Sequence, residues 1–323
     1  MFEKGGTNLI ITGVAGRQTG DIGQTIVDMS KVNYSNAVYM DRFNKRMGEA
    51  RFIDGDEGMW VRLRHDRIGN EDSYRSMNTM YEIGYDAKQV KEDGEHRVGF
   101  AIDYMDGSSS FSQVAGTGEV SRKGFWMYDS WMGEKGHYRD FVAKWGHLSN
   151  DFEFMAGSDE AKADFSNNVY SISAEFGKKN DIGNNWYFEP QAQLQYAHVT
   201  GAEYTTSLAG ADQTEIRNDA FNSLIARAGF RLGRDISNTS TVYFKGDVLH
   251  EFLGDQDVFA KDSTTSNNWQ SVGYDHSGTW YDLGFGFAVK MNKTSYAYLD
   301  FEKSFGNDHD ETYQINAGLQ WAF

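Results

Sequence analysis

Ionisable side chains of both signs fall on the polar phase of segments in which apolar and polar residues alternate. The acids among them are Glu82, Asp86, Asp103, Glu175, Glu189, Asp282, Asp300 and Glu302. The bases are Arg62, Arg64, Lys144, Arg227, Arg231 and Lys245. A carboxylate beside an Asn or Asp residue can act as a general base in backbone cleavage, whereas acids and bases that share a hydrated interior neutralise one another. The mixture of signs favours the ion-paired interior, and backbone cleavage stays open as the alternative.

Histidine suggests a second chemistry, the hydrolysis of a peptide or lipid at an exposed rim. Four of the eight histidines follow outward apolar positions at strand ends, namely His65, His147, His198 and His250. No Ser or Asp stands at a recognisable spacing from them. Imidazoles next to apolar and aromatic residues are typical of a membrane interface. We therefore expect interface residues here, with no catalytic residue, no cofactor and no metal site.

Composition excludes several classes of protein. The 323 residues include no cysteine, one proline and 35 glycines, and aromatic residues reach 15% although the mean hydropathy is negative. Disulfides, thiolate metal sites and cysteine catalysis are excluded. The net charge of −16 argues against nucleic acid as a partner, because binding to phosphates requires an excess of Lys and Arg. No run of about 18 apolar residues is available for a transmembrane helix. Residues 1–6 lack the features of a secretory signal, so an exported chain would be a fragment.

The N-terminal part divides into two segments. Residues 1–23 are rich in Gly and Thr and are interpreted as a linker or the tail of something upstream. The next segment contains no Gly or Pro until Gly48, and its apolar residues recur at helical spacing, which predicts one helix over 24–48. One face of this helix is polar, with Asn33, Asn36 and Asn44. Its surroundings should therefore be partly polar.

From Met59 onward the pattern has a period of two, which indicates strands in an all-β barrel over 49–323. We predict about twelve strands, at 58–68, 76–90, 96–108, 122–132, 137–150, 167–177, 185–199, 221–234, 240–252, 279–291, 294–305 and 312–323. One face of each strand is apolar and aromatic while the other is polar or small. An antiparallel transmembrane barrel explains this, because it turns the apolar face to lipid and the polar face to its lumen.

The connections and one proline refine this prediction. Short turns at one rim and mostly long connections at the other are typical of outer-membrane barrels. The long connections are expected at 109–121, 151–166, 200–220 and 253–278. Two of them are acidic, over 151–164 and 255–275, and solvated charge is favoured over cation or partner binding there. Pro190 lies inside a strand, where a β-bulge would accommodate it.

Barrel size indicates where the helix lies. About twelve strands enclose room for one helix of roughly 10 Å diameter. A helix over 24–47 would extend about 36 Å, enough to cross the bilayer core. Because the first strand starts at the short-turn rim, the helix N-terminus should emerge at the opposite, external rim.

Three motifs stand in order along the chain: NKRMGE at 44–49, EGMWVR at 57–62 and FEPQAQL at 188–194. With them the chain resembles the autotransporter β-domain family over roughly residues 40–323. Residues 44–49 (NKRMGE) resemble the junction after the helix in serine-protease autotransporters of enteric bacteria. Residues 57–62 (EGMWVR) resemble the family's first strand, and residues 188–194 (FEPQAQL) resemble a mid-barrel strand. The chain also ends on an aromatic residue, like the assembly signal of outer-membrane proteins, with Trp321 and Phe323 on the outward phase.

The resemblance implies a monomeric outer-membrane translocator of the type V secretion pathway. Such a domain anchors its N-terminal passenger, accompanies its secretion to the cell surface, and depends on the barrel-assembly machinery and outer-membrane lipid. Residues 1–23 would then be a passenger remnant. The residues expected to matter are those of the luminal helix and junction (Asn33, Asn36, Asn44, Arg46 and Gly48) and the lumen-facing Arg62, Arg64, Glu82, Asp103, Glu175, Glu189, Arg227 and Asp282. The alternatives are a barrel enzyme, either a protease or a phospholipase, and a passive pore.

The resemblance also bears on processing. The self-cleaving branch of the family cuts between two adjacent asparagines just upstream of the Asn-Lys-Arg-Met-Gly motif. Asp41 and Arg42 stand at those positions here. We therefore predict that this barrel does not cut the chain at that bond.

Overall fold

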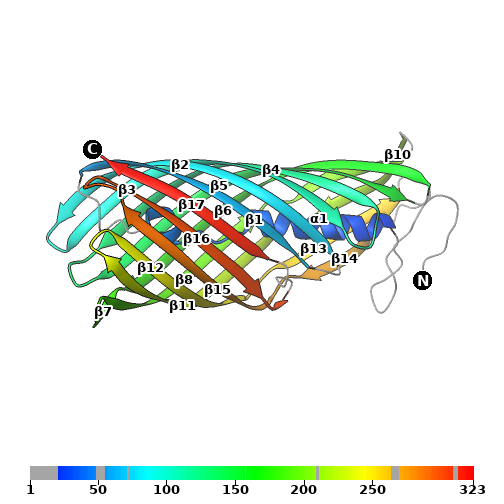
Figure 1. Ribbon diagram of the computed structural model, residues 1–323. Coiled ribbons are helices and arrows are strands. Elements are labelled where there is room, and N and C mark those ends of the chain that lie inside the picture. The colour runs from blue at the N-terminus through cyan, green and yellow to red at the C-terminus, as the bar shows by residue number, and fades with distance from the viewer. Residues whose placement is uncertain are drawn as a thin grey trace.

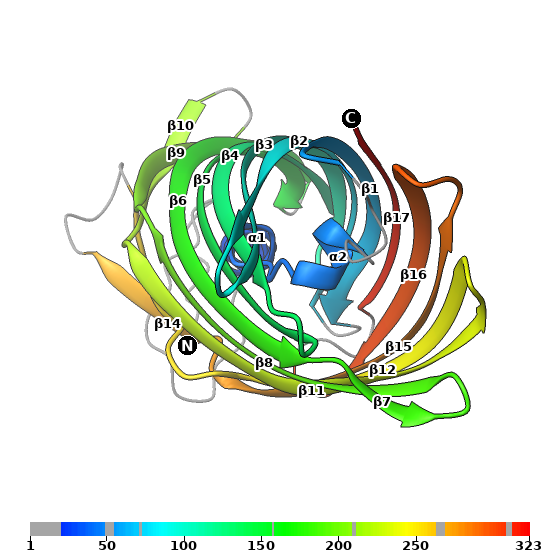
Figure 2. The same cartoon turned by 90° about the vertical axis from the view of Figure 1, so that its left-hand side faces the viewer.

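The alternating segments form a closed antiparallel barrel with helices inside it (Figures 1 and 2). The computed structural model describes residues 21–48, 55–70, 73–156, 158–208, 211–262, 269–307 and 312–323. Within these residues the wall has twelve strands: β1 (Glu57–Asn70), β2 (Tyr74–Lys91), β3 (Gly94–Phe111), β4 (Gly116–Met132), β5 (His137–Ala156), β6 (Asp159–Lys178), β8 (Trp186–Val199), β11 (Phe221–Ser237), β12 (Ser240–Glu251), β15 (Gly278–Lys290), β16 (Ser295–Phe305) and β17 (Tyr313–Ala322). Pairing of β1 with β17 closes the ring. The predicted all-β barrel of about twelve strands is confirmed.

The two faces of the wall differ as the period of two predicts. Large apolar side chains such as Phe100, Met127 and Ile172 point outward and are half exposed or more. Their neighbours on the inward phase, such as Arg97 and Glu175, are buried. This exposed apolar band is suited to lipid, and the buried charges lie in the lumen.

Inward glycines form a repeated contact that the strand pattern did not reveal. Six of them each face an aromatic residue directly across a strand pair, and that ring lies over the glycine. The pairs are Gly84 with Trp60, Gly99 with Tyr128, Gly177 with Tyr138, Gly233 with Tyr187, Gly286 with Tyr243, and Gly318 with Tyr298. A Cβ added to any of these glycines would lie 2.0–2.5 Å from a ring atom. The glycines therefore let bulky aromatic rings lie flat inside a narrow lumen.

The predicted long loops at the external rim are mostly strands, which corrects that expectation. β3 and β4 are joined by residues 112–115 alone, and β5 and β6 by 157–158. The later connections hold β9 (Ala202–Leu208), β10 (Ala211–Asn218), β13 (Asp255–Asp262) and β14 (Gln270–Asp275), which extend the sheet beyond the barrel. The acidic segment 151–164 thus lies on a β-hairpin, and 255–275 includes β13 and β14.

The sense of the alternation reverses in this extension. Phe152, Phe154 and Phe165 point inward and are buried, whereas Asp151 and Glu153 point outward and are exposed. This reversal is expected where water rather than lipid surrounds the wall, because charged side chains are then solvated outside and apolar ones pack inside. The three phenylalanines form a cluster with Ile26, Met29 and Val32 of the first luminal helix.

The luminal segment is two helices rather than the single helix predicted over 24–48. α1 (Asp21–Ala37) and α2 (Phe43–Met47) are separated by an extended segment, and Figure 2 shows both inside the ring. Neither helix that the structure describes is both long and apolar enough to cross a membrane. The part of 24–48 that departs from a helix, residues 38–42, contains the two residues at the aligned cleavage position.

The opposite rim has short turns, and Pro190 lies close to it. β7 (Asn180–Gly183) pairs with the start of β8 in a short hairpin at this rim. Pro190 lies between the last pair of β6 with β8, at Gln191, and the first pair of β7 with β8, at Phe188. On its other side β8 pairs with β11 without a shift in register. The expected bulge is therefore absent at this described strand, because the missing N–H falls at a gap in the ladder.

Candidate functional site at the helix junction

Side chains of the barrel wall terminate both luminal helices. The last carbonyls of an α-helix and the first N–H groups have no partner within the helix. Gln195 donates to the carbonyl of Val38 (2.8 Å) at the end of α1. The backbone N–H of Phe43, which begins α2, donates to Glu175 (2.8 Å). Because the wall satisfies these groups, the helix can break without leaving buried polar groups unpaired.

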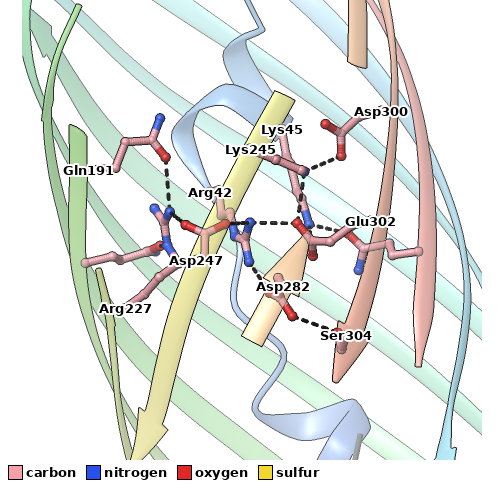
Figure 3. A network of polar contacts seen from close by, with 12 residues as sticks. Arg42, Lys45, Gln191, Arg227, Lys245, Asp247, Asp282, Asp300, Glu302 and Ser304 are labelled. Carbon is pink, nitrogen blue, oxygen red and sulfur yellow. Dashed lines mark hydrogen bonds and ion pairs between the residues drawn. The ribbon is translucent and has the colours of Figure 1, made fainter. Parts of the chain in front are cut away.

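Between the helices, Arg42 is held by three carboxylates (Figure 3). Its guanidinium lies 2.8 Å from Asp247, 2.5 Å from Asp282 and 2.7 Å from Glu302. These acids come from β12, β15 and β16, and all are buried. Arg42 therefore fixes the chain to one side of the lumen.

The preceding residue, Asp41, faces the opposite charge. Its carboxylate lies 2.7 Å from Arg62, 3.3 Å from Arg46 and 3.8 Å from Lys144. Its carbonyl accepts a hydrogen bond from Gln193 (2.6 Å). A single peptide bond is therefore held on one side by a buried anion and on the other by a buried cation.

α2 continues this ionic docking. Lys45 lies 3.0 Å from Glu302, and Arg46 lies 2.5 Å from Asp140, with its guanidinium over the ring of Tyr128. The hydroxyls of Tyr298 and Tyr296 donate to the carbonyls of Lys45 and Met47. α2 is thus bound by the wall at its side chains and at its C-terminal carbonyls.

The other predicted junction residues lie at contacts of the same kind. Asn44 donates to Glu189 (3.0 Å), Asn33 accepts from Asn150 (3.0 Å), and Asn36 bonds the carbonyl of Val32 within α1. Gly48 has a φ of 49°, and a Cβ there would lie 2.3 Å from the ring of Tyr296. A side chain at that position would be excluded both by the backbone conformation and by the ring.

The predicted lumen-facing residues are buried and paired. Arg62 binds Glu82 as well as Asp41, Arg64 binds Asp66 (2.6 Å), and Arg231 binds Glu189 (3.1 Å). Asp103 accepts from Trp126 (2.7 Å), and Arg227 lies 3.1 Å from Glu175. Asp282, the eighth residue of this set, belongs to the Arg42 site. The structure gathers most of them around the two helices.

The sequence did not single out several residues of the site. Gln193 and Gln195 lie on the polar phase of the strand predicted over 185–199, and Asp41 and Arg42 were named only through the resemblance. Asp140 and Asp247 lie on the polar phase of predicted strands, and this position alone could have identified them as lumen-facing. It does not show which residues they pair with.

The four predicted interface histidines lie on the lipid-facing phase. Each ring contacts a Thr or Asn on the next strand through Nδ1: His65 with Thr79, His147 with Asn168, His198 with Asn222, and His250 with Thr279. Among the described residues, none of the four contacts a carboxylate. They lack the acidic group that orients a catalytic imidazole.

Comparison with known proteins places this barrel in a family. The model of the autotransporter beta-domain matches residues 57–302. The chain belongs to the autotransporter β-domain family. It is 28% identical to the probable autotransporter YcgV of Escherichia coli K12 (90% of this chain, 31% of the relative) and 27% identical to the serine protease EatA of Escherichia coli O78:H11 (98% and 23%). It therefore spans less than a third of these relatives.

Solved autotransporter domains share the fold. The β domain of the Bordetella autotransporter BrkA superposes with a TM-score of 0.65 at 21% identity, covering 83% of this chain and 100% of that one. The translocator domain of NalP from Neisseria meningitidis gives 0.68 at 13% identity, covering 93% and 99%. Autotransporter β-domains are outer-membrane translocators whose passenger side faces the cell exterior. The rim at which α1 begins is accordingly the external one.

Proposed function

We propose that this autotransporter domain anchors its own N-terminal passenger and keeps it covalently attached after secretion. The observation that supports this is the pair of opposite ionic sites on either side of the Asp41–Arg42 peptide bond. Removing one partner of a buried ion pair typically costs about 3–5 kcal/mol, so each site resists release of the chain. An uncut chain held this way would display its passenger on the cell surface.

Self-cleavage at this bond is not expected. Full-length chain with a passenger, purified and refolded, should keep one N-terminus, because the Asp41 carboxylate is engaged by three cations and Arg42 by three acids. Mass spectrometry after incubation for days measures this. A new N-terminus at Arg42 would contradict the prediction.

The matched control replaces both residues with asparagine, as Asp41→Asn together with Arg42→Asn. If that variant is cut while the parent is not, the residues at the bond decide the processing. If neither is cut, the surrounding barrel lacks the required chemistry. Exposure of the passenger to protease added outside intact cells tests the proposed display directly.

We further propose that the barrel has no hydrolytic activity of its own. The Thr and Asn partners of the outward histidines support this, as does the engagement of the luminal acids near the junction in ion pairs. The protease names of the relatives describe whole proteins, of which this chain matches about a quarter or less. Hydrolysis of a peptide or phospholipid by the purified barrel would favour the enzyme instead.

Assembly in the cell is proposed to depend on the barrel-assembly machinery and on Phe323. This residue is 62% exposed on the lipid side. Its backbone also exchanges two hydrogen bonds with Glu57, at 2.9 and 3.3 Å, across the seam between β1 and β17. Contact with outer-membrane lipid is part of the same proposal, since Phe323 and Trp321 lie on the outward phase.

Deleting Phe323 should separate stability from assembly. Loss of the aromatic side chain is worth roughly 2–3 kcal/mol, and loss of each of the two seam hydrogen bonds about 1 kcal/mol. Refolding in detergent should still proceed and give a heat-modifiable band, because the rest of the ladder is intact. In cells the outer-membrane level should fall sharply, because an unrecognised chain exposes unpaired strands in the periplasm. Quantitative immunoblots of membrane fractions measure this. Levels equal to the parent would contradict the role of Phe323 in assembly.

A further inference from the structure

Three luminal carboxylates form a cluster that requires a cation. Oxygens of Asp247, Asp282 and Glu302 lie within 4.8 Å of one another, and all three residues are at most 5% exposed. Asp247 and Asp282 are direct partners across β12 and β15. Like charges directly opposite each other in a sheet are destabilising, more so away from water. The three carboxylates therefore need a cation at their centre, and the strands of the wall do not supply one at that position.

The chain supplies that charge from outside the wall. The guanidinium of Arg42 lies at the centre of the cluster, with Nη1 at 2.8 Å from Asp247 and 2.7 Å from Glu302, and Nη2 at 2.5 Å from Asp282. Arg42 belongs to the extended segment between the helices, so it is separable from the strands that hold it. Two nitrogens of one planar guanidinium thus donate hydrogen bonds to three carboxylates. The single nitrogen of an ammonium group cannot reproduce this geometry.

The charge balance around the cluster requires a cation at its centre. In the network of Figure 3, four acids (Asp247, Asp282, Asp300 and Glu302) face four bases (Arg42, Lys45, Arg227 and Lys245). Glu175, which pairs with Arg227, lies at its edge. With Glu175 included, the network without Arg42 has five acids facing three bases. A guanidinium at the position of Arg42 restores the ion pairs to Asp247, Asp282 and Glu302.

A cavity connects this cluster to the external rim. This cavity beside α1 has a volume of about 120 Å³. Its inner end is lined by Arg42, Asp282 and Glu302, and its outer end by Lys31 and Asn307. The carboxylates of Asp282 and Glu302 therefore share one cavity with residues near the external rim, and this cavity is the approach that a small molecule from outside would use.

We propose that Asp247, Asp282 and Glu302 form a binding site for a guanidinium group, reached from the external rim, of which Arg42 is the tethered ligand. Whenever Arg42 is displaced or absent, the site takes a free guanidinium compound. The proposal rests on the proposed function only for the direction from which the ligand enters. The test below uses purified full chain in detergent, so its result does not depend on a passenger.

The test is rescue of Arg42→Ala by methylguanidinium at millimolar concentration, far below denaturing levels. The variant should melt at a lower temperature than the parent, and added methylguanidinium should raise its melting temperature saturably while leaving the parent unchanged. Half of the effect should require on the order of tenfold less methylguanidinium than sodium at matched ionic strength, since the fork makes directed charge-assisted bonds. If Arg42→Ala does not refold alone, its refolding yield with each cation is the readout.

Two controls make the result specific. Arg227→Ala also removes a guanidinium from Asp247, at 2.6 Å, but Arg227 does not line the cavity, so methylguanidinium should not rescue it. Adding Asp282→Asn to Arg42→Ala removes one of the three carboxylates that bind the guanidinium and should abolish the response. Equal effects of sodium and methylguanidinium, or no saturable effect on either melting or yield, would overturn the proposal.

Discussion

Deleting residues 1–47 is expected to convert a poorly conducting barrel into an open, cation-selective channel. Both luminal helices are lost, and both lie inside a lumen formed by twelve strands. The wall strands that the structure describes carry twelve buried acids and eight buried Lys and Arg residues, an excess of four negative charges. The luminal segment contributes three buried bases, Arg42, Lys45 and Arg46, and two buried acids, Asp28 and Asp41, a net of one positive charge against this excess. Its removal should therefore raise conductance several-fold and favour cations over anions.

Single-channel recording in planar bilayers measures both effects, with the reversal potential in a salt gradient giving the selectivity. The matched control deletes residues 1–20 only, which leaves α1 and α2 in place and should leave the conductance unchanged. A heat-modifiable band on a gel verifies that each deleted chain still forms a barrel. Unchanged conductance after the longer deletion would contradict a plugging role for the helices, and high conductance of the parent would favour a passive pore.

The alternating pattern was sufficient to predict the strands of the wall, because each strand must turn one face to lipid and the other to the lumen. Segments such as 281–289 alternate aromatic residues with small or charged ones, and that pattern has one stable solution when one face meets lipid. Ladder partners then follow from antiparallel order. The strand ends did not follow, because the alternation continues beyond the membrane with the opposite sense. Phe152 and Phe154 alternate with acidic residues, and the acidic character of this segment led to the prediction of a loop.

The break between the helices was not predictable from local sequence. Residues 24–47 contain neither Gly nor Pro, and helical spacing of apolar residues continues across the break. The decisive groups lie far away in the sequence: Glu175, Gln193 and Gln195 bind backbone groups at the two helix ends. Tertiary contacts thus outweigh helix propensity here. A single sequence shows which residues face the lumen but not which of them meet.

The same limitation applies to the aromatic rings over glycines. Inward glycines were visible on the polar phase, as at Gly284 and Gly286, and aromatic residues were assigned to the lipid face. Tyr243 and Tyr298 break that rule, since both are inward and buried. The ring needs a partner without a Cβ on the adjacent strand, so only the register explains it.

Asp41→Ala is expected to be among the most damaging single substitutions in the lumen. Arg62 would retain Glu82, and Arg46 would retain Asp140. Lys144 would lose the only ion-pair partner that the described residues give it, although the hydroxyl of Tyr39 stays at 3.3 Å. An uncompensated buried charge costs several kcal/mol, so the free energy of unfolding should fall by about 3–5 kcal/mol. Asp41→Asn should lose nearly as much, because it preserves the shape and removes the charge.

Urea-induced unfolding in lipid vesicles, followed by tryptophan fluorescence, measures these changes, with Trp126 beside Lys144 as a local reporter. Adding Lys144→Met to Asp41→Ala removes the unpaired ammonium and should restore part of the loss, on the order of 1–2 kcal/mol. Lys144→Met alone should be destabilising, since it leaves Asp41 with two cations instead of three. If Asp41→Ala unfolds at the same urea concentration as the parent, the ion pairs on the Asp41 side do not hold the helix junction. If the double variant is no more stable than Asp41→Ala, the loss has a source other than the charge of Lys144.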